Sequence, residues 1–262
     1  MTNKNEIIGS GPDYYKNMSL DSYRGKVNSP AENREYAERY HIPMVTRAKE
    51  KFGSPIHVLS IACGPADELN FIKNDPDTKI IATDFSSYIL THAKKALGEG
   101  AGVFTSDANS PALKENIAEA GILVNAMIYA PDKMLEAMYN ALKPGAQCTL
   151  NFRTFSLVEQ ERGVFGYFLE HGGKVLDREL PVQTRGESRV FNVKVLDYSE
   201  TTKAGSKMPD LERRQLKQQI FFMSLDDMRE LAKLMGFKEI EYSRFVLPGL
   251  HKIYYVLILE KP

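Results

Sequence analysis

The stretch from Val58 to Leu69 constrains the fold of this chain more than any other segment. An apolar run typical of a buried strand ends at a turn of small residues around Gly64-Pro65, and Leu69 and Ile72 follow at helical spacing. A strand, a tight turn and a helix in this order present free backbone N–H groups to a ligand at the carboxyl end of the strand. Gly64 allows close approach to the backbone, and Pro65 suits the first turn of a helix. The stretch therefore predicts a ligand site at the edge of a parallel sheet.

Strands and helices alternate after this turn. The strands are predicted at residues 79–84, 101–106, 121–127 and 146–152, with helices at 86–97 and 131–142. Such alternation is typical of a parallel sheet with helices on both faces. The first of these strands ends at Asp84, about 20 residues beyond the turn, where dinucleotide-binding folds place a carboxylate on ribose hydroxyls.

The alternation stops after the strand at 146–152. Later elements are predicted from alternating polarity, from the capping-box start at Ser224 and from the stop at Gly236. They are a helix at 156–169, a half-exposed strand at 188–197, its antiparallel partner within 211–223, a helix at 224–236, and closing strands at 237–244 and 252–260.

Together these segments resemble the class I S-adenosylmethionine-dependent methyltransferases, well over about residues 56–153 and more loosely from Phe221 onward. The matches are Val58–Ala66 with the glycine-rich first motif, Asp84 with the acid that binds ribose, Asp107-Ala108 with the adenine-binding pair, Ile122–Met127 with the strand under the methionine end of the cofactor, and Leu142-Lys143-Pro144-Gly145 with the turn before the fifth strand. The resemblance implies S-adenosyl-L-methionine as cofactor. It also implies an α/β fold: a Rossmann-like, seven-stranded, mostly parallel sheet flanked by helices, with an N-terminal helical lid and an insertion before the last helix.

We expect one methyltransferase-like domain with four parts. Residues 1–55 form an N-terminal lid or helical arm, 56–153 the cofactor-binding core, 154–222 an insertion on the substrate side, and 223–262 the closing helix and strands.

The N-terminal part contains a helix and an aromatic arm. Ser29-Pro30 predicts the start of a helix that runs towards Tyr40 and is interrupted or restarted at Pro43. The arm from Tyr14 to Arg24 is polar with interspersed tyrosines, so either it covers the cofactor or its rings are half-buried packing residues.

The first motif departs from the family at three positions. The family carries an acid where this chain has Ser60, and glycines where it has Ala62 and Ala66. The missing acid weakens the expected contact to the amino group of the cofactor, and the alanines narrow the turn. We interpret the site as divergent but able to bind.

The resemblance implies a set of cofactor-binding residues. They are Tyr15, Ala62, Cys63, Gly64, Asp84, Phe85, Ser86, Asp107, Ala108, Asn125 and Ala126. Three of them have structural alternatives: Asp84 as a helix cap, Asp107 as a turn residue and Asn125 as a cap at the end of a strand.

Methyl transfer from a sulfonium needs positioning and exclusion of water more than a dedicated catalytic group. The weak catalytic candidates are Asn125, Tyr129 and His171, and no metal is expected because the histidines are scattered. Arginines could recognise an anionic acceptor or could line solvated strand faces; they are Arg153, Arg185, Arg189, Arg213 and Arg214.

Composition narrows the partners. Lys+Arg and Asp+Glu both number 34, so we expect neither nucleic acid nor membrane as a partner. The two cysteines, Cys63 and Cys148, fall at buried strands and form no disulfide framework, and the N-terminus has no hydrophobic signal core, which together favour the cytoplasm. A small-molecule acceptor is expected, and a homodimer stays open.

Three functions remain at this point. The first is methyl transfer to a small molecule. The second is use of the aminocarboxypropyl group of the same cofactor, by cyclisation or transfer, with release of methylthioadenosine. The third is a non-enzymatic binding protein with a retained fold.

Overall fold

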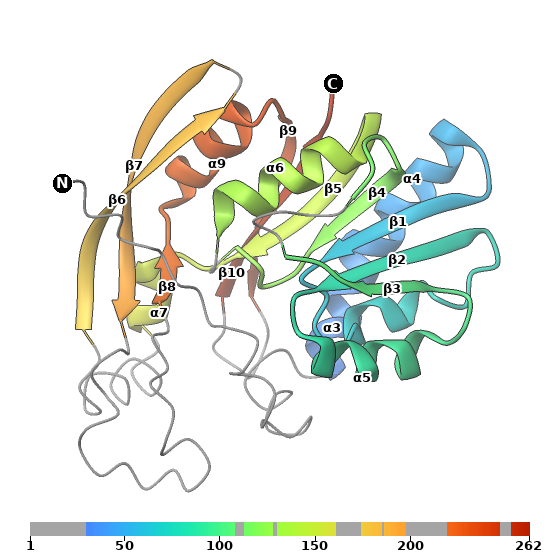
Figure 1. Cartoon of the computed structure of the whole chain (residues 1–262). Helices are drawn as coiled ribbons and strands as arrows, with labels where there is room; N and C mark the ends of the chain where they lie inside the picture. Colours follow the sequence, from blue (N-terminus) through green and yellow to red (C-terminus); the bar gives the residue numbers. More distant parts are fainter. Residues whose placement is uncertain are drawn as a thin grey trace, which may run out of the picture.

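The computed structural model describes residues 30–107, 113–127, 130–160, 174–184, 186–197, 219–246 and 253–262. Within them, seven strands form the main sheet, and its first five run parallel to one another (Figure 1). The seven strands are β1 (Ile56–Ile61), β2 (Thr78–Asp84), β3 (Gly102–Thr105), β4 (Ala118–Leu123), β5 (Leu142–Phe152), β9 (Lys238–Val246) and β10 (Ile253–Glu260).

The strand order in this sheet is β3-β2-β1-β4-β5-β10-β9. Strand β10 is antiparallel to both of its neighbours, β5 and β9. The chain proceeds from β1 outward to β2 and β3, and then returns to β4 on the other side of β1. This reversal puts a crevice at the carboxyl ends of β1 and β4, which is where open α/β sheets bind ligands. The predicted Rossmann-like, mostly parallel, seven-stranded sheet is confirmed.

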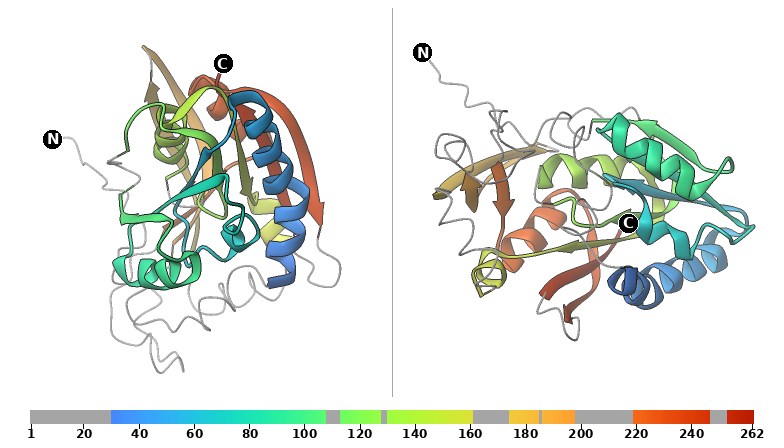
Figure 2. Two further views of the ribbon diagram at one scale, coloured as in Figure 1. Left: turned by 90° about the vertical axis from the view of Figure 1, so that its right-hand side faces the viewer. Right: turned by 90° about the horizontal axis from the view of Figure 1, so that it is seen from below.

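Helices cover both faces of the main sheet (Figure 2). On one face, buried apolar side chains from three helices pack on β1, β2 and β4. On the other face, α6 and α9 pack on β1, β4 and β5. The helices are α4 (Ile42–Phe52), η2 (Asp67–Phe71) and α5 (Ser87–Leu97) on the first face, and α6 (Pro131–Ala141) and α9 (Leu225–Leu234) on the second.

Two helix starts follow the expected capping chemistry. The Ser86 hydroxyl accepts a hydrogen bond from the N–H of Ile89 at the start of α5, and the Ser224 hydroxyl accepts one from the N–H of Asp227 at the start of α9. Each serine thereby satisfies a backbone donor that has no partner inside its helix.

The N-terminal helix is continuous but changes its winding before Pro43. It comprises α3 (Pro30–Tyr36), the π-helical turn η1 (Ala37–His41) and α4. A proline inside a helix clashes with the carbonyl four residues earlier, and a wider π turn relieves that clash. The predicted helix start at Pro30 is confirmed, and Pro43 changes the winding without ending the helix.

The helix predicted after the first turn is wrong in length. Only the five-residue 3₁₀ element η2 forms, and Pro65 lies before it because Ala66 has a left-handed conformation (φ 61°, ψ 28°) that separates Pro65 from the helix. Leu69 and Ile72 are nevertheless buried as predicted.

The fourth strand also ends earlier than predicted. It stops at Leu123 and not at Met127. Asn125 has a φ of 54°, and its N–H donates to the side-chain oxygen Oδ1 of Asn151 at 2.6 Å, so the chain leaves the sheet at this point.

The segment predicted as an insertion forms a second, antiparallel sheet of order β6-β7-β8. Its strands are β6 (Lys174–Thr184), β7 (Glu187–Asp197) and β8 (Gln219–Phe222), and a short helix, α7 (Phe155–Gln160), precedes them. The prediction of a strand at 188–197 with a partner within 211–223 is confirmed by β7 and β8. The helix predicted at 156–169 begins as α7, and its residues from 161 onward lie outside the described part of the chain.

Strand β6 was missed because its polarity does not alternate cleanly. Asp177-Arg178-Glu179 is charged throughout, and Pro181 interrupts the apolar pair Leu180 and Val182. Pro181 is tolerated because β6 lies at the edge of its sheet. Leu180, Val182 and Phe191 belong to the same buried cluster as α6 and α9, so the second sheet shares the core of the main one.

Candidate functional site

The turn after β1 carries three residues in the left-handed region. The φ angles of Ala62, Gly64 and Ala66 are 54°, 54° and 61°. Ala62 and Ala66 therefore adopt a conformation that glycine reaches without cost, which explains why the resembling family has glycine there. For an alanine the left-handed conformation costs roughly 1–2 kcal/mol.

We expect Ala62→Gly to raise the free energy of unfolding by about 0.5–1 kcal/mol, because relief of the positive φ outweighs the added chain entropy of glycine. Ala62 is the better test position, since Ala66 is fully buried and would also lose a packed methyl group. Ala96→Gly in helix α5, where φ is ordinary and the side chain is half-buried like that of Ala62, is the matched control and should lose about 1 kcal/mol. Urea titration measures both, and equal losses in the two variants would contradict a strained turn.

The N–H groups of this turn are already used within the protein. The N–H of Cys63 donates to the Thr83 carbonyl at 2.9 Å, that of Gly64 to Asp84 Oδ2 at 2.9 Å, and that of Ala66 to the Cys63 carbonyl at 2.9 Å. The expectation of free donors at these three residues is therefore wrong. These bonds lock the turn onto the end of β2.

Asp84 joins the turn to the start of α5. Its Oδ2 accepts from Gly64, and its Oδ1 accepts from the N–H of Ser86 at 2.9 Å. Burial raises the pKa of the Asp84 carboxyl, while these N–H bonds oppose that rise. Ser86, and not Asp84, is the N-cap of α5, so the helix-cap alternative for Asp84 is wrong. The N–H of Phe85 also bonds to this carboxylate, so three of its roughly four lone-pair sites are used and one remains for a ribose hydroxyl.

Glu68 is a buried acid that the sequence-based prediction missed. It lies in η2 directly after the turn, and 7% of it is exposed. Burial raises the pKa of its carboxyl to about 8, and the nearby Asp67 and Asp84 carboxylates add to the rise. Its position four residues after Gly64, beside the apolar Leu69, was the available signal.

The carboxyl ends of β4 and β5 are tied together by two asparagines. Asn151 is buried and holds the backbone of Asn125 through Oδ1, while its Nδ2 donor has no hydrogen-bond partner among the described residues. Ala126 is buried beside this link, and the guanidinium of Arg153 lies 5.6 Å from the ring centre of Tyr254. The N–H of Asn125 therefore fixes where the chain leaves β4, and the predicted roles of its side chain stay predictions.

Aromatic side chains of the N-terminal helix close one side of this region. Tyr36 packs edge-on against His41 and Phe245, at centroid distances of 4.9 and 5.6 Å. Tyr40 donates to or accepts from the Ser243 hydroxyl at 2.7 Å. Val124, which follows β4, packs against this same cluster and brings it next to the crevice.

His41 is fully buried, and burial lowers its pKa to about 3, so it is neutral at physiological pH. Its two ring nitrogens have no hydrogen-bond partner in the described part of the chain. The described residues contain no group of three or more His, Cys, Asp or Glu side chains arranged to hold a metal ion. Neither cysteine, Cys63 or Cys148, forms a disulfide, and both are buried.

The remaining predicted site residues lie near the turn, on the second sheet or outside the described residues. Phe85 is half-buried, Ser86 is buried and Asp107 is exposed, and all three lie where β2 and β3 end, close to the turn. Arg189 is exposed and pairs with Glu230, as the alternative of a solvated strand face expects. Outside the described residues lie Tyr15, Ala108, Tyr129, His171, Arg185, Arg213, Arg214 and the predicted lid from Tyr14 to Arg24.

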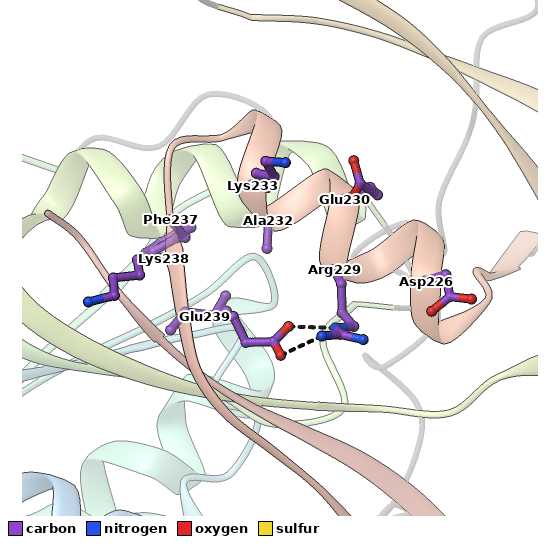
Figure 3. Close-up of a pocket in the computed structure, with 9 residues that line it drawn as sticks. Asp226, Arg229, Glu230, Ala232, Lys233, Phe237, Lys238 and Glu239 are labelled. Carbon is purple, nitrogen blue, oxygen red and sulfur yellow. Dashed lines mark hydrogen bonds and ion pairs between the residues drawn. The ribbon is translucent and has the colours of Figure 1, made fainter.

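A separate open pocket of about 740 Å³ lies between α9 and β9 (Figure 3). Its wall includes a bidentate ion pair from Arg229 to Glu239, at 2.7 and 2.9 Å, and the apolar Phe237 and Leu259. Leu259 of β10 pairs with Cys148 of β5, one residue after Gln147, where the pairing of β5 with β10 begins. The pocket therefore lies towards the amino end of β5, away from the turn and Asp84.

No helix in the described ranges has both the length and the apolar character needed to cross a bilayer. No protein-family model and no curated protein matches the sequence.

Solved structures do match the fold. Magnesium protoporphyrin IX methyltransferase from Synechocystis PCC 6803, solved with S-adenosylhomocysteine bound, aligns with a TM-score of 0.58 and 12% identity over 96% of this chain and 98% of that one. An S-adenosylmethionine-dependent methyltransferase from Mesorhizobium loti aligns with a TM-score of 0.55 and 11% identity, covering 87% of this chain and 97% of that one. One from Methanosarcina mazei aligns with a TM-score of 0.53 and 15% identity, covering 79% and 93%. By its strand order, its two helix layers and these likenesses, the chain has the fold of the class I S-adenosylmethionine-dependent methyltransferases.

Proposed function

We propose that this protein is a cytoplasmic methyltransferase that uses S-adenosyl-L-methionine to methylate a small molecule. One observation carries the proposal: the turn at residues 62–66 is held against the end of β2 by the bond from Gly64 to the buried carboxylate of Asp84. This places an acid with spare acceptor capacity at the crevice between β1 and β4, where this fold type binds its ligand.

The polar groups of the site suit this cofactor. Asp84 offers a carboxylate acceptor site for a ribose hydroxyl, and the exposed Asp107 lies at the end of β3 for the adenine side. The Nδ2 group of Asn151 and the Tyr36 hydroxyl are buried polar groups without a hydrogen-bond partner in the described ranges, and buried groups of this kind favour a polar ligand. The cofactor-binding roles of Ala62, Cys63, Gly64, Phe85, Ser86, Asn125 and Ala126 remain predictions on the same basis.

The bound cofactor would supply a methyl group on a positively charged sulfur. The task of this chain is then to hold that methyl in line with an acceptor and to exclude water. The second sheet supports an acceptor on its side of the crevice, because it packs on α6 and α9 and follows β5 and α7 in the chain. The two free, buried cysteines suit a reducing compartment.

Product analysis tests the proposal. Purified protein is incubated with S-adenosylmethionine and a panel of small molecules that carry hydroxyl, amine, carboxyl or acidic carbon groups. Formation of S-adenosylhomocysteine that depends on one acceptor is the expected result. Methylthioadenosine would instead assign transfer or cyclisation of the aminocarboxypropyl group, and calorimetry without any binding of S-adenosylhomocysteine would refute a cofactor site.

A further inference from the structure

Glu68 is a buried acid with no basic partner in the described part of the chain. It forms no ion pair with any Lys, Arg or His side chain in the described residues, and only 7% of it is exposed. Burying a carboxylate without a cation costs free energy, so such a group either is protonated or binds a positively charged ligand. The described residues therefore provide no ion pair that would stabilise the charged form of Glu68.

The titratable groups that act electrostatically on Glu68 are two acids, a thiol and a phenol, while the cation Arg34 of α3, which packs against η2, lies over the Phe71 ring and forms no ion pair with Glu68. The groups that interact with it electrostatically are Asp67 on η2, Asp84 on β2, Cys63 in the turn and Tyr36 on α3. None of these groups carries a positive charge at neutral pH. Asp67 and Asp84 therefore add negative potential beside the turn, and none of the four interacting groups in the described residues supplies a positive charge to balance it.

Two buried hydroxyls, one on α3 and one on β1, have no hydrogen-bond partner in the described part of the chain, and such groups favour a polar ligand. The Tyr36 side chain is 1% exposed, and its hydroxyl has no hydrogen-bond partner in the described part of the chain. Glu68 lies near enough to this phenol to help raise its pKa, after burial and Tyr40. The Ser60 hydroxyl, at the position where the resembling family has an acid, is also buried without a partner in those residues. These orphaned groups are an observation independent of the acids themselves.

We propose that Glu68 binds the ammonium group of the methionine part of S-adenosylmethionine, in place of the acid that Ser60 replaces. The inference rests on the proposed function and deepens it by naming a residue that binds the cofactor. An ammonium group offers three N–H donors to a carboxylate, whereas a sulfonium offers none. A carboxylate held at the sulfonium would also present a competing nucleophile to the methyl group. The ammonium is therefore the cation that Glu68 fits.

The raised pKa supplies a readout that a structural role would not give. With a pKa of about 8, the Glu68 carboxyl is mostly protonated at pH 7 in the free protein. Pairing with an ammonium group favours the charged form, so binding lowers that pKa and releases a proton. We expect close to one proton released per ligand at pH 7, measured by calorimetry in buffers of different ionisation enthalpy.

The experiment compares two ligands and three proteins. S-adenosylhomocysteine carries the ammonium group, while methylthioadenosine lacks the whole aminocarboxypropyl group. In Glu68→Gln we expect the affinity for S-adenosylhomocysteine to fall about 10- to 100-fold and its proton release to disappear, with methylthioadenosine binding unchanged. The glutamine keeps the size and neutrality of the protonated acid, so the variant should fold. Asp67→Asn removes an acid from the neighbouring residue and is the charge-matched control, with an expected loss under about 3-fold.

Each other outcome has a definite meaning. Equal losses in Glu68→Gln and Asp67→Asn, an equal loss for both ligands, or proton release that persists in Glu68→Gln would overturn the proposal. If Glu68→Gln does not fold, the wild-type protein still tests the proposal. Binding of S-adenosylhomocysteine must then release a proton, and binding of methylthioadenosine must release none. A wild-type protein that binds S-adenosylhomocysteine while Glu68→Gln binds it equally well refutes this inference alone. A wild-type protein that binds neither ligand refutes the proposed function as well.

Discussion

Asp84→Ala should lower the affinity for S-adenosylhomocysteine by about 30- to 150-fold, equivalent to about 2–3 kcal/mol. The substitution removes the acceptor for a ribose hydroxyl and also leaves the N–H groups of Gly64 and Ser86 without their present partner. The loss should therefore appear both in the dissociation constant, measured by calorimetry, and in the melting temperature of the ligand-free protein.

Two further variants separate these effects. Asp84→Asn keeps one carbonyl acceptor for a backbone N–H, so it should recover part of the melting temperature while binding stays weak. Asp107→Ala removes an exposed acid at the end of β3 and should leave the ligand-free stability unchanged. A folded Asp84→Ala variant that binds as tightly as the wild type would reduce Asp84 to an anchor of the turn.

Gly121→Ala should lower the free energy of unfolding by about 1–3 kcal/mol, the usual cost of overpacking a buried core. Gly121 lies in β4, whose six residues are all buried. A Cβ atom at this position would collide with Met138 Sδ of α6 and would lie 2.8 Å from Cys148 Cβ of β5. Met138 can rotate away, but Cys148 is fixed by the adjacent strand, so β4 and β5 must shift. Urea denaturation measures the loss.

Gly102→Ala is the matched control for this substitution. Gly102 is also a strand glycine, but it lies in the edge strand β3, and its nearest neighbour would be the Ile80 carbonyl oxygen at 3.8 Å, an ordinary contact. Its stability should change by less than about 0.5 kcal/mol. Similar losses in the two variants would show that the close approach of α6 to β4 does not limit this position.

The fold was largely predictable because burial repeats with a local period. The bounds of α5, α6, α9 and β10 lie within two residues of their predicted positions. In each case an apolar periodicity or a capping serine lies within the segment itself. The seven-stranded, mostly parallel sheet followed from the resemblance and is confirmed, whereas the position of β1 between β2 and β4 comes from the structure.

The failures have a common physical cause, which is competition from contacts distant in sequence. Strand β4 ends early because Asn125 bonds to Asn151, which lies 26 residues further along the chain. Strand β6 forms although its charges and Pro181 conceal any alternation, because β7 pairs with it along its whole length. The free N–H groups expected in the turn are occupied because Asp84 and Thr83 of β2 reach them across the sheet.

The sequence by itself determined which segments form the core and that Asp84 ends the strand beside the turn, because both depend on residue types a few positions apart. The tertiary structure alone decided that Glu68, Asp84 and Tyr36 share one buried region, since these residues come from η2, β2 and α3. It alone also decided that Glu68 is buried next to Asp67 and Asp84, and this burial, together with those acids, raises the pKa of its carboxyl. Burial and charge pairing depend on every neighbour in space, and a linear pattern records only the neighbours along the chain.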